Sequence, residues 1–213
     1  MSAGFATIVA PEKATVSELL DLIAQQVAGC KRCGLCAGRT NTVPGSGNPH
    51  ARVMLIGEAP GKNEDLKGQP FVGAAGKNLG EFLSFAGLNR DDVFIANILK
   101  CRPPSNRNPQ PEEIELCTPY LRDQVRAISP QYLVTMGNFA TQFILKTQKG
   151  ITSLRGTPIS VGKFTVFPVF HPAAAIYDRS KRAVLEQDFT RLGVLLSTVS
   201  SDESDPSSGA ANS

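Results

Sequence analysis

The sequence predicts an α/β fold with a mostly parallel sheet of four strands and with helices on both faces of that sheet. Four short runs are apolar and rich in β-branched residues, as buried strands are, and they lie at 52–56, 93–98, 132–136 and 164–170. Segments of helical length follow them in alternation, at 74–86, 111–128, 138–146 and 181–198. This alternation is typical of parallel sheets that are covered by helices.

A further helix is predicted before the first strand. Thr15 and Glu18 have the spacing of a capping box, so we expect the helix to run from there to Ala28 and to end at Gly29. The last residues are small and polar, which is typical of disorder. The expected organisation is a flexible N-terminus at 1–12, one domain at 13–199 and a disordered tail at 200–213.

Length and charge narrow the class of protein. A chain of 213 residues can bury a sizeable core without disulfides. It has neither a long apolar run nor a signal peptide, so we expect a cytoplasmic monomer with no membrane partner. The last 13 residues hold three acids and no base, and the rest of the chain has 22 basic and 16 acidic residues. This basic excess is compatible with a polyanionic partner and equally with ordinary solubility.

Five cysteines form the first candidate site. An odd number of cysteines without a secretion signal argues against a disulfide framework. Cys30 and Cys33 are separated by two residues, Cys101 follows the second strand, and Cys117 lies in the next helix. Two such pairs of thiolates can hold iron–sulfur or structural zinc, and buried inert thiols are the alternative. Cys36 competes for a place, because Cys-x2-Cys-x2-Cys also resembles ferredoxin ligation.

Polar and aromatic residues gather where the predicted strands end. The first strand leads into Glu58 and a loop that carries one aromatic ring, Phe71, while the second strand ends with Asn97 and the last one precedes His171. The carboxyl ends of parallel strands meet at the edge of the sheet where ligands bind, so these residues are expected to converge. Taken singly, each has a structural alternative: a solvated loop acid, a core ring, a strand-end amide or a structural histidine.

These segments resemble the family 4 uracil-DNA glycosylases, the bacterial and archaeal iron–sulfur branch, over roughly residues 28–195. The resemblance rests on Cys30-x2-Cys33-x-Leu35, on GEAPGKNEDLKGQPFVGAAG at 57–76, on ANILKCRPPSNRNP at 96–109 with Cys117, and on HPAAAIY at 171–177. It implies a three-layer α/β/α sandwich around a central parallel sheet. It also implies a structural [4Fe–4S] cluster on Cys30, Cys33, Cys101 and Cys117, with Cys36 left out.

The resemblance further implies an enzyme that flips uracil out of single- or double-stranded DNA and hydrolyses its N-glycosidic bond. The abasic site that remains starts base excision repair. Phe71 is expected to stack on the flipped ring, and the side chain of Asn97 to read its edge. The pocket is expected to be lined by backbone groups of Glu58, Ala59 and Pro60.

The same resemblance assigns the chemical roles. His171 is expected to donate a hydrogen bond, as a neutral imidazole, to the 2-carbonyl oxygen of uracil, where negative charge develops. A carboxylate must support the sugar cation or position water, and Glu58 is favoured slightly over Glu64. Asn106 is a further candidate for contact with water or phosphate.

Contacts with the DNA are expected from the loops that follow these motifs. Arg107 and Arg179 are candidates for phosphate contacts, and Ile176 or Tyr177 for the wedge that fills the gap left by the flipped base. The alternative function is an iron–sulfur nucleic-acid-binding accessory protein without glycosylase activity, which explains the cysteines but not the convergent residues.

Overall fold

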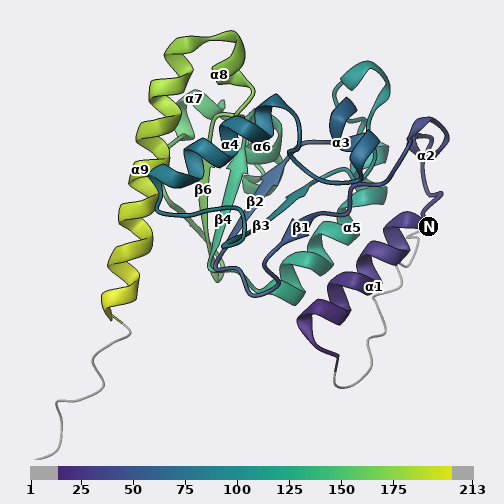
Figure 1. The fold of residues 1–213 in the computed structure, drawn as a ribbon, viewed down its shortest axis with the longest axis horizontal. Helices are drawn as coiled ribbons and strands as arrows, with labels where there is room; N and C mark the ends of the chain where they lie inside the picture. The colour runs from purple at the N-terminus through teal and green to yellow at the C-terminus, as the bar shows by residue number, and fades with distance from the viewer. Residues whose placement is uncertain (1–13, 203–213) are drawn as a thin grey trace, which may run out of the picture.

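The computed structural model describes residues 14–202, and a six-stranded sheet lies at its centre (Figure 1). The strand order is β1-β3-β2-β4-β6-β5. The four inner strands run parallel and are β2 (Val53–Gly57), β3 (Val93–Asn97), β4 (Tyr132–Met136) and β6 (Phe164–Val169). The sequence predicted all four, with bounds that differ by at most one residue.

The prediction of four strands is nevertheless wrong, because a short antiparallel strand closes each edge of the sheet. These edge strands are β1 (Ser46–Gly47), which pairs with β3, and β5 (Ile159–Val161), which pairs with β6. Two and three residues are too few to show an alternating apolar pattern. Both edge strands are also largely exposed, so no apolar run marks them.

The long helices agree with the sequence. The first of them begins after Thr15, whose side chain and that of Glu18 cap each other's backbone as predicted. The last begins two residues earlier than predicted and continues to Asp202. The five are α1 (Val16–Ala28), α4 (Ala74–Phe85), α5 (Pro111–Ile128), α6 (Asn138–Leu145) and α9 (Arg179–Asp202). The predicted flexible N-terminus at 1–12 lies outside the described residues. The predicted disordered tail at 200–213 begins too early, because residues 200–202 belong to α9, and its remainder lies outside the described residues.

Short helical segments in the loops were not predicted. They are α2 (Leu35–Gly38), α3 (Lys62–Lys67), α7 (Ile151–Leu154), α8 (Ala174–Tyr177) and the 3-10 turn η1 (Pro104–Asn106). One turn or little more is too short for a helical period to be visible in a sequence. Three of them, α3, η1 and α8, lie in the loops that follow β2, β3 and β6.

Helices cover both faces of the sheet, which gives the expected three layers (Figure 1). Alternate residues of the inner strands, such as Leu55 and Ile95, pack with α4 and α9 on one face. Their neighbours, such as Met54 and Phe94, pack with α5 and α6 on the other. Every residue of β2, β3 and β4 is buried, as expected for a parallel sheet between helices. Within residues 14–202, none of the helices combines the length and apolar character that a membrane span needs.

We predict that Phe189→Ala lowers the free energy of unfolding by about 3–5 kcal/mol, because it empties a buried position in the layer formed by α4 and α9. Phe189 is fully buried and stacks on Phe82, with 5.8 Å between ring centroids. Val194→Ala in the same helix is the matched control, since Val194 is 60% exposed. Chemical denaturation measures both variants, and equal losses would contradict the proposed core.

Candidate active site and cysteine centre

A cavity opens at the carboxyl edge of the parallel strands. The register aligns Gly57 at the end of β2 with Asn97 at the end of β3, and β6 delivers His171 two residues after its last position. The structure therefore brings together residues that are far apart in the sequence. The cavity is lined by Ala59, Gly61, Glu64, Phe71, Ala75, Asn97 and His171. Glu58 and Pro60, which were expected in the pocket, do not line it.

Gly57 allows the amide and the ring to lie side by side. A Cβ atom at this position would overlap the Oδ1 atom of Asn97, and it would lie 3.1 Å from the ring of Phe71. Asn97 is only 2% exposed and lines the cavity, and none of the side-chain hydrogen bonds within residues 14–202 involves its amide. Since no fully buried side-chain N or O atom in these residues lacks a partner, the amide must reach the cavity. Buried amides normally have partners, so an unengaged amide in a cavity wall is available to a ligand.

Phe71 presents an aromatic face to this cavity. Its ring stacks with that of His171, with 5.5 Å between centroids and 30° between planes. Phe71 is buried, and its φ of 53° lies in the left-handed region that residues with a side chain rarely adopt. Such backbone strain persists where the surroundings hold a residue in place, and it is common at functional sites.

His171 is held as a neutral imidazole with a defined tautomer. The backbone N–H of Ala173 donates to Nδ1 at 3.2 Å, so Nδ1 carries no proton and Nε2 carries the N–H. Burial lowers the pKa of His171 to about 4, and the nearby carboxylate of Glu64 opposes this shift. The cavity thus contains a hydrogen-bond donor that stays uncharged at neutral pH.

The two candidate carboxylates have different surroundings. Oε1 of Glu64 accepts the backbone N–H groups of Val72 and Gly73, each at 3.0 Å, so this carboxylate holds the loop that carries Phe71. Glu58 is half-buried, its carboxylate makes no hydrogen bond within the described residues, and burial raises its pKa. A partly desolvated, unengaged carboxyl beside a cavity is a candidate acid–base group.

All five cysteines line a single hollow beside the active-site cavity. Cys30 follows α1, Cys33 and Cys36 flank the start of α2, Cys101 follows β3, and Cys117 lies in α5. All five are free thiols. In residues 14–202, no group of three or more His, Cys, Asp or Glu side chains converges as the ligand set of one metal ion. The cysteines instead surround the hollow.

Polar groups donate hydrogen bonds to two of these sulfur atoms. Nη1 of Arg39 lies 3.2 Å from the Sγ of Cys101, and the backbone N–H of Lys100 lies 3.2 Å from the Sγ of Cys117. Burial raises the pKa of Cys101 and raises that of Cys117 to about 12. These thiols therefore remain protonated unless a bound cation stabilises the thiolates.

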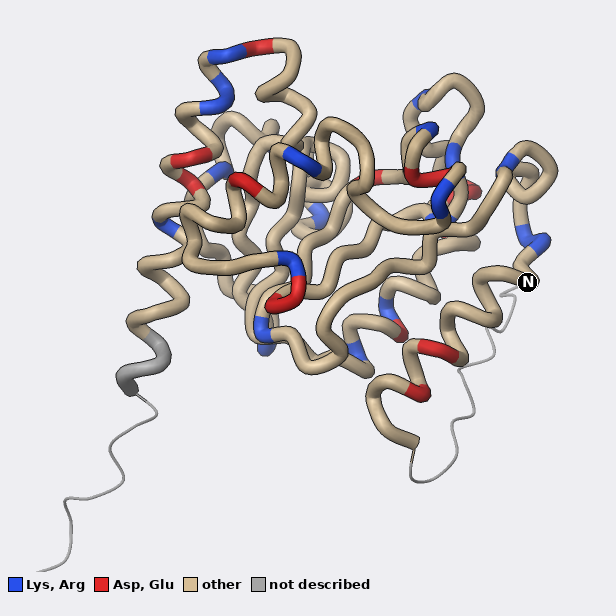
Figure 2. Tube along the Cα trace, viewed as in Figure 1, with Lys and Arg blue, Asp and Glu red and all other residues tan. Residues whose placement is uncertain are grey.

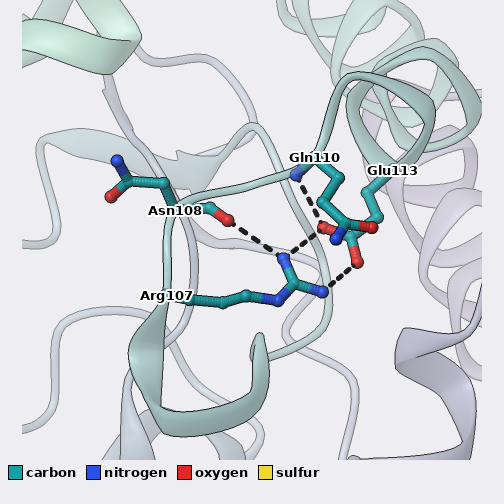
Figure 3. Close-up of polar contacts among 4 residues, drawn as sticks. All are labelled: Arg107, Asn108, Gln110 and Glu113. Atoms are coloured by element: carbon teal, nitrogen blue, oxygen red, sulfur yellow. Dashed lines mark hydrogen bonds and ion pairs between the residues drawn. The ribbon is translucent and has the colours of Figure 1, made fainter.

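Arg107, a candidate for DNA contact, is engaged in a local network (Figure 3). Its guanidinium forms a two-pronged salt bridge with Glu113, at 2.6 and 2.9 Å, and donates to the backbone oxygen of Asn108 at 2.9 Å. Glu113 also accepts the backbone N–H of Gln110 at the start of α5. The network fastens the loop before α5 to that helix, and Arg107 remains 35% exposed.

The other candidates for DNA contact lie outside the cavity. Asn106 is exposed in η1 and accepts a hydrogen bond from Nε of Arg102 at 2.8 Å. Ile176 and Tyr177, in α8, are 46% and 88% exposed, and Arg179 follows them on the surface. Figure 2 shows Lys and Arg on the turn between α8 and α9 and on the loop before α5.

Sequence reasoning missed two cations that contact the backbone of the segments carrying Phe71 and Asn97. Arg90 donates to the carbonyl oxygens of Pro70 and Phe71, and Lys100 donates to the carbonyl oxygen of Asn97. Only Lys100 could have been noticed in the sequence, because this charged residue stands between the apolar pair Ile98-Leu99 and a cysteine. Arg90 lies in a polar turn, where a charged residue is unremarkable.

Comparisons with known proteins agree with this geometry. The family description of the uracil DNA glycosylase superfamily matches residues 44–192. A type-4 uracil-DNA glycosylase of Saccharolobus solfataricus is 46% identical over 188 residues, which cover 84% of this chain and 87% of that protein. One of Thermotoga maritima is 43% identical over 81% of this chain and 92% of its own length. A type-5 uracil-DNA glycosylase of Pyrobaculum aerophilum is less similar, at 32% identity over 62% of this chain and 65% of its own. The chain therefore belongs to the uracil DNA glycosylase superfamily, in its type-4 family.

Proposed function

We propose that this protein is a monofunctional uracil-DNA glycosylase, which flips uracil out of DNA, hydrolyses its N-glycosidic bond and leaves an abasic site for base excision repair. The observation that carries the proposal is the cavity in which a strained aromatic ring, an unengaged amide and a neutral imidazole meet. The names of the type-4 relatives support the same activity.

Base recognition follows from the two residues that meet at Gly57. A flipped pyrimidine in the cavity can stack on the ring of Phe71, and base–aromatic stacking contributes about 1–3 kcal/mol per base. The Asn97 amide has one acceptor and two donor hydrogens, which match the N3–H and the 4-carbonyl of uracil. Cytosine presents an unprotonated N3 and an amino group there, so an amide held in this orientation would face it acceptor to acceptor and donor to donor. Its own unpaired groups would then penalise the wrong base.

His171 supplies the donor that the leaving group needs. Breaking the N-glycosidic bond leaves an oxocarbenium-like sugar and a uracil anion, whose charge develops on the 2-carbonyl oxygen. The Nε2–H of His171 is the free donor of this imidazole, because Nδ1 accepts the N–H of Ala173. A positioned donor in a dry cavity stabilises charge more than it would in water, without giving up its proton.

Glu58, rather than Glu64, is the carboxylate proposed to position the attacking water molecule. The carboxylate of Glu64 accepts two backbone N–H groups, and this role fixes the Phe71 loop. The carboxylate of Glu58 makes no such hydrogen bonds. Burial raises its pKa toward the range in which a carboxylate acts as a general base. Glu58 lies directly after β2 and next to Ala59, which lines the cavity, and from there it is proposed to orient water toward the sugar carbon.

The cysteine hollow fits a [4Fe–4S] cluster by its chemistry. Its potential ligands are thiols alone, and two of them already accept hydrogen bonds that favour the thiolate form. A cluster needs thiolates spread around its surface, whereas a zinc ion needs them aimed at one point. The spread seen here supports the cluster on Cys30, Cys33, Cys101 and Cys117. Bound there, it would supply a structural link between α1, α5 and the end of β3.

Uracil-containing DNA is the proposed partner, in single- or double-stranded form. Ile176 and Tyr177 project from α8 next to the cavity, where a wedge can fill the space left by the flipped base. Arg179 and the exposed part of Arg107 are proposed to contact phosphates. An accessory protein without activity would need the cysteines and the basic loops but not a cavity lined by an amide, an aromatic ring and an imidazole.

The first prediction tests the activity. The purified protein should release free uracil from an oligonucleotide with a single uracil, and His171→Ala should lower the single-turnover rate by about 10²–10³-fold while DNA binding is kept. His50→Ala is the matched control, because His50 is the exposed second histidine of the chain. Absence of uracil release from the intact protein would favour the accessory alternative.

The second prediction concerns pH. The folded-state pKa of His171 is about 4 and its ordinary value is 6.5, so the imidazole stays neutral as pH falls from 8 to 5. The single-turnover rate should therefore show no inflection at pH 6.5 that depends on His171. Folding stability should behave differently, because the unfolded chain binds a proton below pH 6.5 and the folded chain does not until about pH 4. Stability from this group is thus present above pH 6.5 and is lost as pH falls toward 4.

NMR of the two imidazole side chains measures this directly, with His50→Ala used to assign the signals. A His171 signal that titrates with a midpoint at 6.5 or above in the folded protein would contradict the neutral-donor mechanism.

The third prediction distinguishes the proposed cluster ligands, represented by Cys101, from Cys36. Cys101→Ser should lose iron, the iron–sulfur absorbance and thermal stability together, since metal binding and folding are coupled. Cys36→Ser, in the same hollow, should keep all three. Metal analysis of protein purified without oxygen gives the answer, and stoichiometric zinc without iron would overturn the cluster assignment.

A further inference from the structure

Two cations next to the active-site cavity donate hydrogen bonds to the backbone of the residues proposed to read the base. Nη1 of Arg90 lies 3.1 Å from the carbonyl oxygen of Phe71, and Nη2 lies 3.0 Å from that of Pro70. Nζ of Lys100 lies 2.9 Å from the carbonyl oxygen of Asn97. The cavity itself contains neither cation, so both act from behind its wall.

Arg90 completes a clamp around the strained peptide of Phe71. Its guanidinium fork binds the two carbonyl oxygens at Pro70 and Phe71, and Glu64 binds the N–H groups of the two residues that follow. Gly76 closes the third side, because a Cβ atom there would overlap the carbonyl group of Phe71. The left-handed φ of 53° is therefore enforced by contacts from three directions.

Lys100 joins the end of β3 to helix α5. It is 1% exposed, and its ammonium also donates to Oε1 of Gln124 at 2.7 Å. Gln124 in turn donates to the carbonyl oxygen of Pro44 at 2.7 Å, which fixes the orientation of its amide. The carbonyl of Asn97 is thus held by a side chain whose other contacts are themselves fixed.

Both side chains are cations, and burying a cation costs free energy unless other groups compensate for the lost hydration. Arg90 is half-buried and burial lowers its pKa, while Lys100 is 1% exposed, so both have lost hydration. Within the described residues neither forms a salt bridge with a carboxylate. Buried charges usually have a charged partner, and here backbone carbonyl oxygens take that place.

We propose that Arg90 and Lys100 are positioning residues, which hold the stacking ring of Phe71 and the reading amide of Asn97 in place through their backbone carbonyl groups before DNA binds. The inference rests on the proposed roles of Phe71 and Asn97. Neither cation touches the base. Each fixes the backbone from which a base-contacting side chain projects. These side chains therefore lose less conformational entropy when the uracil binds.

A double-mutant cycle tests Arg90. Arg90→Met should lower the single-turnover rate of uracil release by about 10- to 100-fold, because a shift of about 1 Å in a site group can cost 10²-fold. Its affinity for DNA should change less than about threefold, because the phosphate contacts lie elsewhere. Arg90→Lys should recover only part of the rate, because an ammonium keeps the charge but cannot form the two-pronged contact. In the Phe71→Ala background, Arg90→Met should have less than about a twofold further effect.

The same design tests Lys100 against Asn97. Lys100→Met should lower the rate and weaken inhibition by free uracil, and both effects should largely vanish in the Asn97→Ala background. Iron content and iron–sulfur absorbance are measured for every Lys100 variant, because its neighbour Cys101 is a proposed ligand. A slow variant with an unchanged iron content supports positioning.

The matched control is Arg52→Met. Arg52 also uses its guanidinium in a forked contact, with Oε1 of Gln131 at 2.9 and 3.3 Å, but at the opposite, amino end of the strands. Arg52→Met should change the single-turnover rate of uracil release by less than about twofold. Rate losses for Arg90→Met or Lys100→Met that are equal in both backgrounds would overturn the proposal, as would the absence of any loss.

The outcomes separate this inference from the proposed function. If Phe71→Ala and Asn97→Ala themselves leave uracil release unchanged, the proposed base contacts fail. If these two variants are slow but the cation variants are normal, only the positioning role fails.

Discussion

The active site depends on the absence of a side chain at Gly57. β2 and β3 are neighbours in register, so the ends of the two strands cannot separate to make room. A single Cβ atom at Gly57 would overlap the Asn97 amide and press on the ring of Phe71. The strand ends therefore place the amide, whereas the ring of Phe71 is placed by its loop, which Glu64 and Arg90 hold. A site built on strands keeps its geometry better than one built on loops alone.

Loss of hydration then sets the charge of the groups in and beside this cavity. The same physical cause lowers the pKa of His171 and raises that of Glu58, because burial opposes a charge of either sign. The carboxylate of Glu64 accepts two backbone N–H groups and supports the Phe71 loop. A neutral donor and a weakly acidic carboxyl thus lie near a carboxylate that serves as structural support. This distribution suits a reaction in which negative charge appears on the base and positive charge on the sugar.

The sequence predicted the parallel core and the convergence of Asn97 and His171, because strand direction determines which ends meet. Phe71 also lines the cavity as expected, whereas Glu58, which was expected to converge with them, does not. The sequence could not separate Glu58 from Glu64. Their difference lies in hydrogen bonds to Val72 and Gly73, and those bonds exist only once the loop has folded. Arg107 illustrates the same limit, since its proximity to Glu113 depends on how the loop turns back onto α5. The edge strands escaped prediction because pairing partners, and not their own residues, define them.

The cysteine hollow and the base-reading site share one short piece of chain. Asn97 ends β3, Lys100 follows three residues later, and Cys101 is next to it. Lys100 contacts both sides, through its ammonium to the Asn97 carbonyl and through its backbone N–H to Cys117. A group bound by the thiols would hold α1 and α5 to this segment and would restrict the residues that orient the amide. The distance along the chain is too short for the two sites to relax independently. The proposed cluster would therefore affect base selection through this segment, without taking part in the chemistry.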